Sequence, residues 1–240
     1  MQGITMASRL AVQEGRATRR SDAIVARSQN DLDALPGIGI TVTAEPGQTI
    51  VVERDPVEHY YRIVRGTVRL YRSLADGRRQ VIDFLSARDC FGLTGLDCHA
   101  YSVEAVSRVV MIRYPRHLLE AAVQSDPGLA SRLFRLACAE LGRAQEQMLL
   151  LARKTAEERI ASFLLRLAQT DTGAGQPVVT LAMSRLDIAD HLGLTIETVS
   201  RTLSRFKRDG LIGLPGRHEI ALCRVERIRA LAEGGGGPGV

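Results

Sequence analysis

Three polar side chains near the C-terminal end of the chain have the types and spacing needed to read DNA bases. Glu197, Ser200 and Arg201 fall at i, i+3 and i+4, which places them on one face of a helix. Arginine can donate two hydrogen bonds to guanine O6 and N7, glutamate can accept one from cytosine N4, and a short serine lets the helix lie deep. A carboxylate is a poor partner for phosphate, so the pattern favours base reading. The alternative is a surface helix with ordinary salt bridges.

The same stretch carries an apolar face, which must pack against a neighbouring element. Residues at helical spacing form it: Ile196, Val199, Leu203 and Phe206. Upstream, Ser184 to Asp187 resembles a capping box that opens a shorter helix. The apolar face of that shorter helix is expected to hold Leu186, Ile188, Ala189 and Leu192. Gly193 permits a sharp turn and Thr195 is a suitable N-cap, so the pair predicts a helix-turn-helix whose second helix enters the major groove.

Basic and hydroxyl residues around these two helices are suited to the phosphate backbone. Between Val199 and Arg217 several arginines and a lysine face the single acid Asp209. We expect backbone contacts from Ser184, Arg185, Thr195, Thr198, Ser204, Arg205 and Arg217. The stretch DGLIGLPGRHEIAL predicts two short strands around a Pro-Gly turn, a wing that could lay Arg217 on the backbone. Sequence-specific binding of duplex DNA is therefore the predicted chemistry.

A long helix is predicted over residues 128–154, where the chain has no internal turn signal. Residues spaced alternately by four and three make one stripe along it: Phe134, Cys138, Leu141, Gln145, Met148 and Ala152. This spacing is typical of a helix that packs along its length on a like helix, so we expect a homodimer seam. The alternative is a helix lying on its own β domain, and both can hold because MLLLA is apolar on more than one side. An amphipathic helix with Ile160, Phe163, Leu164 and Leu167 follows.

The residues from Thr41 to about Arg113 have the texture of a β domain. Short runs rich in Val, Ile and Tyr alternate with Gly or Pro, and Asp76-Gly77 is a strong hairpin signal. We expect an α+β chain with a jelly-roll domain, a dimerisation helix and a winged helix-turn-helix. The expected divisions are a basic N-terminal arm (1–40), the jelly roll (41–127), the dimerisation helix (128–154), the DNA-binding domain (155–233) and a Gly-rich tail (234–240).

Composition narrows the class of protein and of site. The formal net charge is +5, which suits an anionic partner. No apolar run approaches the length of a membrane span and no signal peptide is evident, so we expect a cytoplasmic protein with no membrane partner. The four cysteines are scattered and the five histidines have no metal-binding spacing, so we expect reduced thiols and no metal site.

The order of these elements resembles the CRP/FNR family of bacterial transcription regulators, from Thr41 to Glu233. The most specific match is IADHLGLTIETVSRTLSRFKRDGLI. Members of the cAMP-receptor type carry R-E-T-V-G-R, where this chain has Ile196 and Ser200 in place of Arg and Gly. The resulting E-x-x-S-R pattern is that of the FNR and FixK branch. The resemblance implies a homodimer on a palindromic promoter like TTGA…TCAA, read by Glu197, Ser200 and Arg201, and a role chiefly as activator. By analogy, RNA polymerase could contact the hairpin tip Ala75 to Arg79.

The resemblance also shows which effectors lack their residues here. Cyclic-nucleotide binders resemble F-G-E followed by R-[ST]-A, but Phe91-Gly92 precedes Leu93 and DCHAYSVEA offers no such arginine. No cysteine precedes Cys90, so an N-terminal iron–sulfur cluster with four cysteine ligands is not expected, while haem is harder to exclude. We therefore expect no cofactor, as in the FixK type. Cys138 and Cys223 are candidate redox thiols, and the alternatives are a regulator gated by an unrecognised ligand in the jelly roll and, remotely, a cupin-like enzyme.

Overall fold

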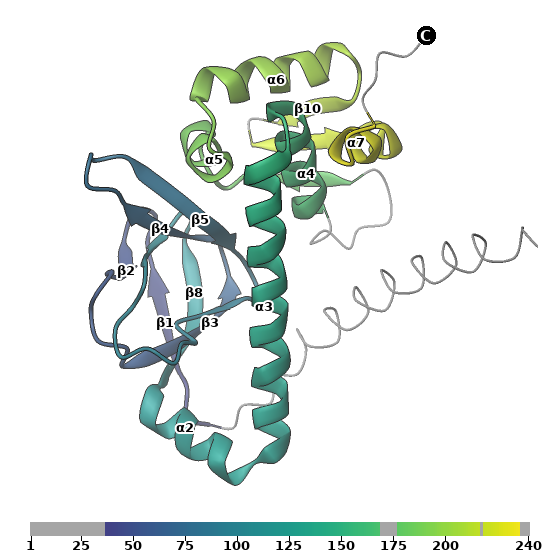
Figure 1. The fold of residues 1–240 in the computed structure, drawn as a ribbon. Helices are drawn as coiled ribbons and strands as arrows, with labels where there is room; N and C mark the ends of the chain where they lie inside the picture. Colours follow the sequence, from purple (N-terminus) through teal and green to yellow (C-terminus); the bar gives the residue numbers. More distant parts are fainter. Residues whose placement is uncertain (1–36, 169–176, 217, 236–240) are drawn as a thin grey trace, which may run out of the picture.

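The computed structural model describes residues 37–168, 177–216 and 218–235 of the chain. Its N-terminal part is built from two four-stranded antiparallel sheets, ordered β1-β8-β3-β6 and β2-β7-β4-β5 (Figure 1). The strands are β1 (Ile40–Ala44), β2 (Thr49–Val51), β3 (His59–Arg65), β4 (Val68–Ser73), β5 (Arg79–Leu85), β6 (Cys90–Phe91), β7 (Ser102–Ala105) and β8 (Val109–Pro115). The predicted N-terminal β domain of an α+β chain is confirmed.

The two sheets pack together because each strand turns its apolar side chains toward the same interior. Along β4, Val68 and Leu70 are buried, whereas Arg69 on the opposite face is partly exposed. Ile63 of β3 and Met111 of β8 come from the other sheet and join Val68 and Leu70 in one core. The period-two alternation in the sequence therefore decides which face of each sheet is inside.

The hairpin predicted at Asp76-Gly77 connects β4 to β5. Gly77 has φ +83°, a left-handed conformation that a glycine adopts without steric cost. Its N–H donates to Leu74 O at 3.0 Å, and Leu74 N–H donates to Arg78 O at 2.8 Å. The register then places Ser73 opposite Arg79. This turn fixes which side chains of β5 face the C-terminal domain.

Three helices follow the β domain: α2 (Arg116–Ser125), α3 (Pro127–Arg153) and α4 (Ala156–Ala168). α3 begins where the Asp126 carboxylate accepts the Gly128 N–H at 2.8 Å, with Pro127 in the first helical position. It has 27 residues and is therefore about 40 Å long. The extended backbone of Lys154 (φ −88°, ψ 144°) ends it. In Figure 1, α3 runs beside the β domain and carries the C-terminal domain at its far end.

The C-terminal domain combines helices with a three-stranded sheet in the order β10-β11-β9. Its remaining elements are β9 (Val178–Thr180), α5 (Arg185–Leu192), α6 (Ile196–Arg208), β10 (Ile212–Gly216), β11 (Glu219–Leu222) and α7 (Val225–Ala232). β10 and β11 form the predicted wing. β9, α2 and α7 were not predicted from the sequence; β9 has only three residues and α7 only eight.

The C-terminal domain shares its core with the β domain. Val81 and Phe84 of β5 belong to the same buried cluster as Phe163 of α4 and Leu192 of α5. β5 is the edge strand of its sheet, and α5 lies between that edge and α6 (Figure 1). The position of α6 relative to the β domain therefore depends on how α5 packs on β5.

Candidate nucleic-acid interface

The first helix of the predicted pair, α5, begins with the capping box expected from the sequence. Ser184 Oγ accepts the Asp187 N–H at 3.1 Å, and Asp187 Oδ2 accepts the Ser184 N–H at 3.1 Å. Ile188, Ala189 and Leu192 are buried as predicted. Leu186 was placed on that buried face wrongly: its side chain is 51% exposed, because the first turn of α5 extends beyond the core.

A tight turn joins α5 to α6 and sets the angle between them. Gly193 has φ +61°, and Leu194 N–H donates to Ala189 O at 3.0 Å. Thr195 caps α6 as predicted, since its Oγ1 accepts the Thr198 N–H at 3.2 Å. Arg159 of α4 supports the turn by donating from Nη1 to Leu192 O at 2.8 Å. The turn is therefore held by local caps and by an arginine from outside the motif.

The apolar stripe of α6 faces the domain core. Val199, Leu203 and Phe206 are buried there. Ile196, expected on the same stripe, is 40% exposed, because it occupies the first position of the helix, near the turn. Three of the four apolar predictions for this helix are confirmed, and their burial fixes which face of α6 points outward.

The outward face of α6 carries the three predicted base-reading residues. Glu197 and Arg201 are exposed and Ser200 is half-buried. The pKa of Glu197 is held below its ordinary value by hydrogen bonds from its own backbone N–H and from the Thr195 hydroxyl, and further by the nearby charge of Arg201. Glu197 is therefore an ionised acceptor at neutral pH, one turn from the Arg201 guanidinium. Together they offer an acceptor and a forked donor on one surface.

Arg205, predicted as a phosphate contact, has a protein partner in the folded chain, and its side chain is still 50% exposed. Its Nη1 lies 2.5 Å from Glu157 Oε1 of α4, and its Nη2 donates to Glu157 Oε2 at 2.6 Å. This two-point ion pair ties α6 to α4. The Ser184 hydroxyl, also predicted to contact the DNA phosphates, donates to Asp187 Oδ2 at 2.7 Å within the capping box.

The other residues predicted to contact DNA phosphates, so far as the structure describes them, lie on α5, on α6 and on the turn between these helices. Arg185, Thr195 and Ser204 are exposed, and Thr198 is half-buried. Arg217, expected at the tip of the wing, lies outside the described residues. Lys207 and Arg208 are exposed in the last turn of α6 and extend the basic surface.

The stripe predicted as a homodimer seam lies on the exposed side of α3. Phe134 is 71% exposed and Met148 is 62% exposed. The other members are exposed as well: Cys138, Leu141, Gln145 and Ala152. Leu149, which the sequence analysis left out of the stripe, is a further large apolar side chain exposed on α3. A contiguous apolar surface of this kind marks an interaction site.

The cysteines are free thiols in different surroundings. Cys98, Cys138 and Cys223 are exposed, whereas burial raises the pKa of Cys90 to about 12. Among the described residues, no group of three or more His, Cys, Asp and Glu side chains is arranged to hold a metal ion. Within the same residues, no helix combines the length and apolar content that a membrane crossing requires.

Known proteins share both halves of this architecture. Residues 41–126 match the family described as cyclic nucleotide-binding domain, and residues 158–231 match the Crp-like helix-turn-helix domain. The chain is 35% identical over 218 residues to the nitrogen fixation regulation protein FixK of Bradyrhizobium diazoefficiens, covering 90% of this chain and 92% of that protein. The chain belongs to the CRP/FNR family of transcription regulators. The predicted family resemblance is thus confirmed.

Other members of the CRP/FNR family give the same assignment. The FixK protein of Azorhizobium caulinodans is 48% identical over 177 residues, which are 72% of this chain and 71% of that protein. The solved structure of FixK2 from Bradyrhizobium japonicum superposes with a TM-score of 0.78 at 38% identity, over 81% of this chain and 98% of that one. The chain is therefore a DNA-binding transcription regulator of this family, with α6 as the second helix of its helix-turn-helix.

Proposed function

We propose that the chain binds, as a homodimer, an inverted repeat resembling TTGA…TCAA, and that Glu197, Ser200 and Arg201 read each half-site. The observation that carries this proposal is the division of α6 into two faces. Burial of Val199 and Leu203 leaves the E-x-x-S-R face outward, away from the core. In a helix-turn-helix, that face enters the major groove.

The outward residues suit a G·C pair within each half-site. The guanidinium of Arg201 can donate to guanine O6 and N7, and the ionised Glu197 can accept from cytosine N4. Ser200 lies between them and is half-buried, so it adds little bulk between helix and base edge. The exposed hydroxyls and basic residues around α6 are expected to hold the phosphates, without specifying sequence.

A second copy of the chain is the proposed partner of α3. A palindromic site requires a two-fold protein, and the exposed stripe from Phe134 to Ala152 would pair with its symmetry mate. The opposite side of α3 meets its own β domain, since Leu129 packs in a core with Tyr60 and Tyr114. The two alternatives for this helix are thus compatible, each on its own face.

We further propose that DNA binding needs no small-molecule effector. Cyclic-nucleotide binders carry a glutamate after Phe-Gly, where this chain has Leu93, and both Leu93 and the nearby Tyr101 are used for packing. Leu93 packs against the cluster that contains Tyr60 and Leu119. Tyr101 packs on the sheet core, and its hydroxyl takes a hydrogen bond from the Gly92 backbone N–H. These contacts support a β domain that fills its own interior.

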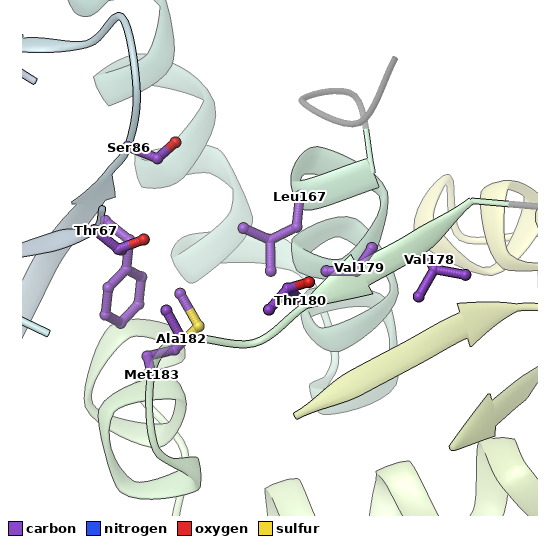
Figure 2. Close-up of a pocket in the computed structure, with 9 residues that line it drawn as sticks. Thr67, Ser86, Leu167, Val178, Val179, Thr180, Ala182 and Met183 are labelled. Carbon is purple, nitrogen blue, oxygen red and sulfur yellow. The ribbon is translucent and has the colours of Figure 1, made fainter. Parts of the chain in front are cut away.

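The alternative, a regulator gated by a ligand, is favoured by one observation. A crevice of about 320 Å³ lies between the two domains, lined by Thr67 and Ser86 of the β domain and by Leu167 and Met183 of the C-terminal domain (Figure 2). Among the described residues, those that line it are apolar or carry hydroxyls, and none of these is charged. It would suit a small neutral molecule better than a nucleotide phosphate. A ligand-dependent rise in melting temperature would support this alternative.

Activation through RNA polymerase is the proposed outcome of binding, with the tip of the β4–β5 hairpin as the contact. Asp76 and Arg78 project there, and the Arg78 Nε lies 2.7 Å from Asp76 Oδ2. Arg79, included in the predicted contact, points back to the C-terminal domain and pairs with Asp190. Transcription in vitro with Arg78→Ala should fall without loss of operator affinity; unchanged transcription would remove the hairpin from the proposal.

A binding selection on random duplex DNA tests the proposed site. Purified protein without added ligand should enrich two half-sites related by a dyad, each with a preferred guanine. The Arg201→Ala protein should enrich the same spacing with a relaxed choice at one base pair. Enrichment of single half-sites, or of no sequence at all, would contradict the proposed homodimeric readout.

A further inference from the structure

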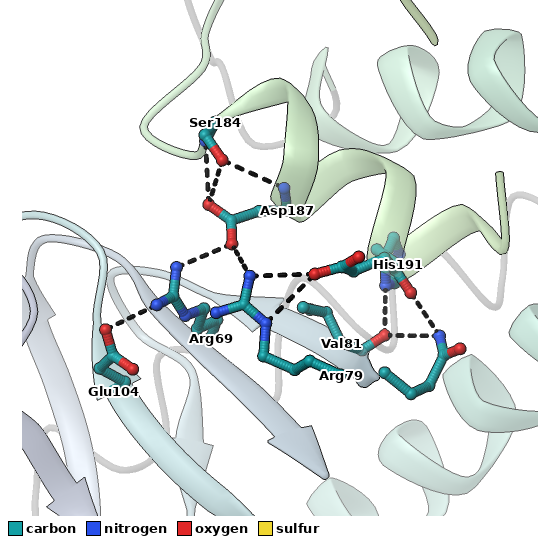
Figure 3. Close-up of polar contacts among 9 residues, drawn as sticks. Arg69, Arg79, Val81, Glu104, Ser184, Asp187 and His191 are labelled. Carbon is teal, nitrogen blue, oxygen red and sulfur yellow. Dashed lines mark hydrogen bonds and ion pairs between the residues drawn. The ribbon is translucent and has the colours of Figure 1, made fainter. Parts of the chain in front are cut away.

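A buried ionic cluster fastens the first helix of the helix-turn-helix to the β domain (Figure 3). Asp187 of α5 has a side chain only 5% exposed, and its Oδ1 accepts from two arginines of the β4–β5 hairpin. The distances are 2.7 Å to Arg69 Nη1 and 2.6 Å to Arg79 Nη2. Arg69 also donates to Glu104 Oε1 of β7 at 2.6 Å. One buried carboxylate thus joins two strands to α5.

Arg79 makes a second contact with the same helix. Asp190 Oδ2 lies 3.0 Å from Arg79 Nη2 and 3.2 Å from Arg79 Nε. The next residue of β5, Gln80, donates from Nε2 to the Asp190 backbone O at 2.6 Å. Both the side chain and the backbone of Asp190 are therefore held by consecutive residues of one strand.

The remaining contact of α5 with β5 passes through His191. Its Nδ1 lies 3.2 Å from Val81 O, and its Nε2 lies 2.9 Å from Arg166 Nη2 of α4. Arg166 in turn donates from Nη1 to Asp83 Oδ1 of β5 at 2.7 Å. A neutral imidazole that donates from Nδ1 and accepts at Nε2 satisfies both of these neighbours. β5 therefore contacts α5 directly or through α4 along most of its length.

These contacts select one orientation of α5. Buried charges are tolerated only when they are paired, and removing one partner leaves the other desolvated and unpaired. A rotation of the C-terminal domain about the break at Lys154 would part Asp187 and Asp190 from Arg79. The ion pairs oppose that rotation, and α6 would move with α5 because Ala189 and Val199 belong to one buried core.

We propose that Arg79 and Asp190, with Arg69 and Asp187, are positioning residues for DNA recognition: they fix the distance between the two α6 helices of a dimer. Two half-sites of a helix-turn-helix dimer lie about one turn of DNA apart, roughly 34–36 Å. An error in the angle of α5 would move both recognition helices off that spacing. The ionic cluster sets the angle with the protein's own side chains, where a bound effector would otherwise be needed. This inference rests on the proposed homodimer and inverted repeat.

The test measures affinity against operator spacing. Wild type, Arg79→Gln, Asp190→Asn and the double variant are titrated on duplexes whose half-site separation is native, one base pair shorter or one base pair longer. On the duplex with native spacing, each single variant should bind about tenfold more weakly than wild type, within the usual range of coupling between sites. On the two duplexes with altered spacing, the loss of affinity should be much smaller. The double variant should be no worse than Arg79→Gln alone, because the Arg79–Asp190 contact that Asp190→Asn weakens is already lost in that variant.

Two comparisons separate positioning from simpler causes. Asp190→Asn removes a negative charge, so general attraction to DNA predicts tighter binding, whereas the proposal predicts weaker binding to the native operator. Arg78→Gln is the matched control, since it removes the same charge from the same hairpin as Arg79→Gln. Arg78 pairs with Asp76 at the exposed tip. The Arg78→Gln protein should therefore keep the wild-type preference for the native spacing. If Arg79→Gln fails to fold, Asp190→Asn decides alone, since Asp190 is less deeply buried than Asp187.

The outcomes distinguish this inference from the function on which it rests. If the variants lose the same factor of affinity on all three duplexes, or keep the wild-type preference for the native spacing, the positioning role is overturned and the proposed function stands. Wild-type protein with no preference for an inverted repeat or its spacing overturns both. Relaxed spacing in Arg79→Gln and Asp190→Asn, with Arg78→Gln unchanged, supports the inference.

Discussion

Glu157 at the start of α4 accepts both arms of the Arg205 guanidinium on α6, at 2.5 Å and 2.6 Å. The pair bridges 48 positions of sequence and connects the recognition helix to the helix that follows the long α3. The Arg205 side chain is still 50% exposed beside this contact, so its predicted role at the phosphate backbone stays a prediction. The protein uses the ion pair to orient α6.

The first prediction concerns this pair. Arg205→Ala and Glu157→Gln should each lower the free energy of unfolding by at most about 1 kcal/mol, because the pair is partly exposed and screened by solvent. Glu157→Gln leaves the charge of α6 intact, so its effect on operator affinity should be small and equal for all sequences. Urea unfolding and DNA titration measure the two effects. A loss of base preference in Glu157→Gln would contradict this expectation and would show that the pair positions the base-reading face of α6.

The second prediction concerns base reading. Arg201→Ala should cost roughly 1–3 kcal/mol on the proposed operator and relax the preference at one guanine. Glu197→Ala should relax a neighbouring position. Lys207→Ala is the control, since an exposed lysine in the last turn is expected to weaken binding uniformly. Should Arg201→Ala weaken all duplexes equally, Arg201 would be a phosphate contact.

The third prediction concerns assembly. Met148→Glu places two carboxylates at the proposed α3 seam of a dimer, where they would lose water and repel each other. Dimerisation and operator affinity should then fall together, as measured by sedimentation and titration. Leu118→Glu is the matched control, since Leu118 is an exposed apolar residue on α2, away from the α3 stripe. A dimeric Met148→Glu protein with wild-type affinity would place the seam elsewhere.

The fourth prediction concerns pH. Burial, with the nearby Arg166 guanidinium, lowers the pKa of His191 from 6.5 to about 4. Between about pH 6.5 and about pH 4, the unfolded chain therefore takes up a proton on this imidazole and the folded protein does not. The stabilisation that comes from this neutral imidazole is therefore complete above about pH 6.5 and is lost progressively as the pH falls from 6.5 to about 4.

The magnitude can be measured by comparison with His191→Asn, whose amide can still donate to Val81 O. Between about pH 7.5 and about pH 5, wild type should lose up to about 2 kcal/mol more unfolding free energy than the variant. Urea unfolding at both pH values gives the difference. An equal loss in both proteins would mean that His191 titrates normally and is not buried as described.

The sequence predicts those parts of the site whose signals are local. Ser184 and Asp187 stand three residues apart and Gly193 follows one short helix, so the capping box and the turn could be predicted from spacing alone. The burial of Val199 and Leu203 follows from helical period in the same way. These elements place Glu197 and Arg201 outward without reference to the rest of the chain.

Contacts between distant segments could not be predicted in this way. Asp187 is an ordinary capping residue in the sequence, yet its second oxygen meets Arg69, 118 positions away. Arg205 fits a phosphate-binding stripe equally well whether or not Glu157 lies beside it. One sequence contains no periodic signal for pairs of this kind, because they depend on how distant segments of the chain pack against one another. β9 was missed for a related reason, since it is only three residues long and is defined by its pairing with β11.

The central claim is that a homodimer reads an inverted repeat through Glu197, Ser200 and Arg201 with no effector bound. The most direct test is equilibrium binding of purified wild-type protein, with thiol reductant and chelator but no nucleotide, haem or iron–sulfur reconstitution. Two duplexes are compared, TTGA…TCAA and the same sequence with one half-site scrambled. The account predicts a Kd on the order of 10⁻⁸–10⁻¹¹ M for the intact repeat at physiological salt and much weaker binding to the scrambled one. Equal affinity for both duplexes, or binding only after an effector is added, would contradict it.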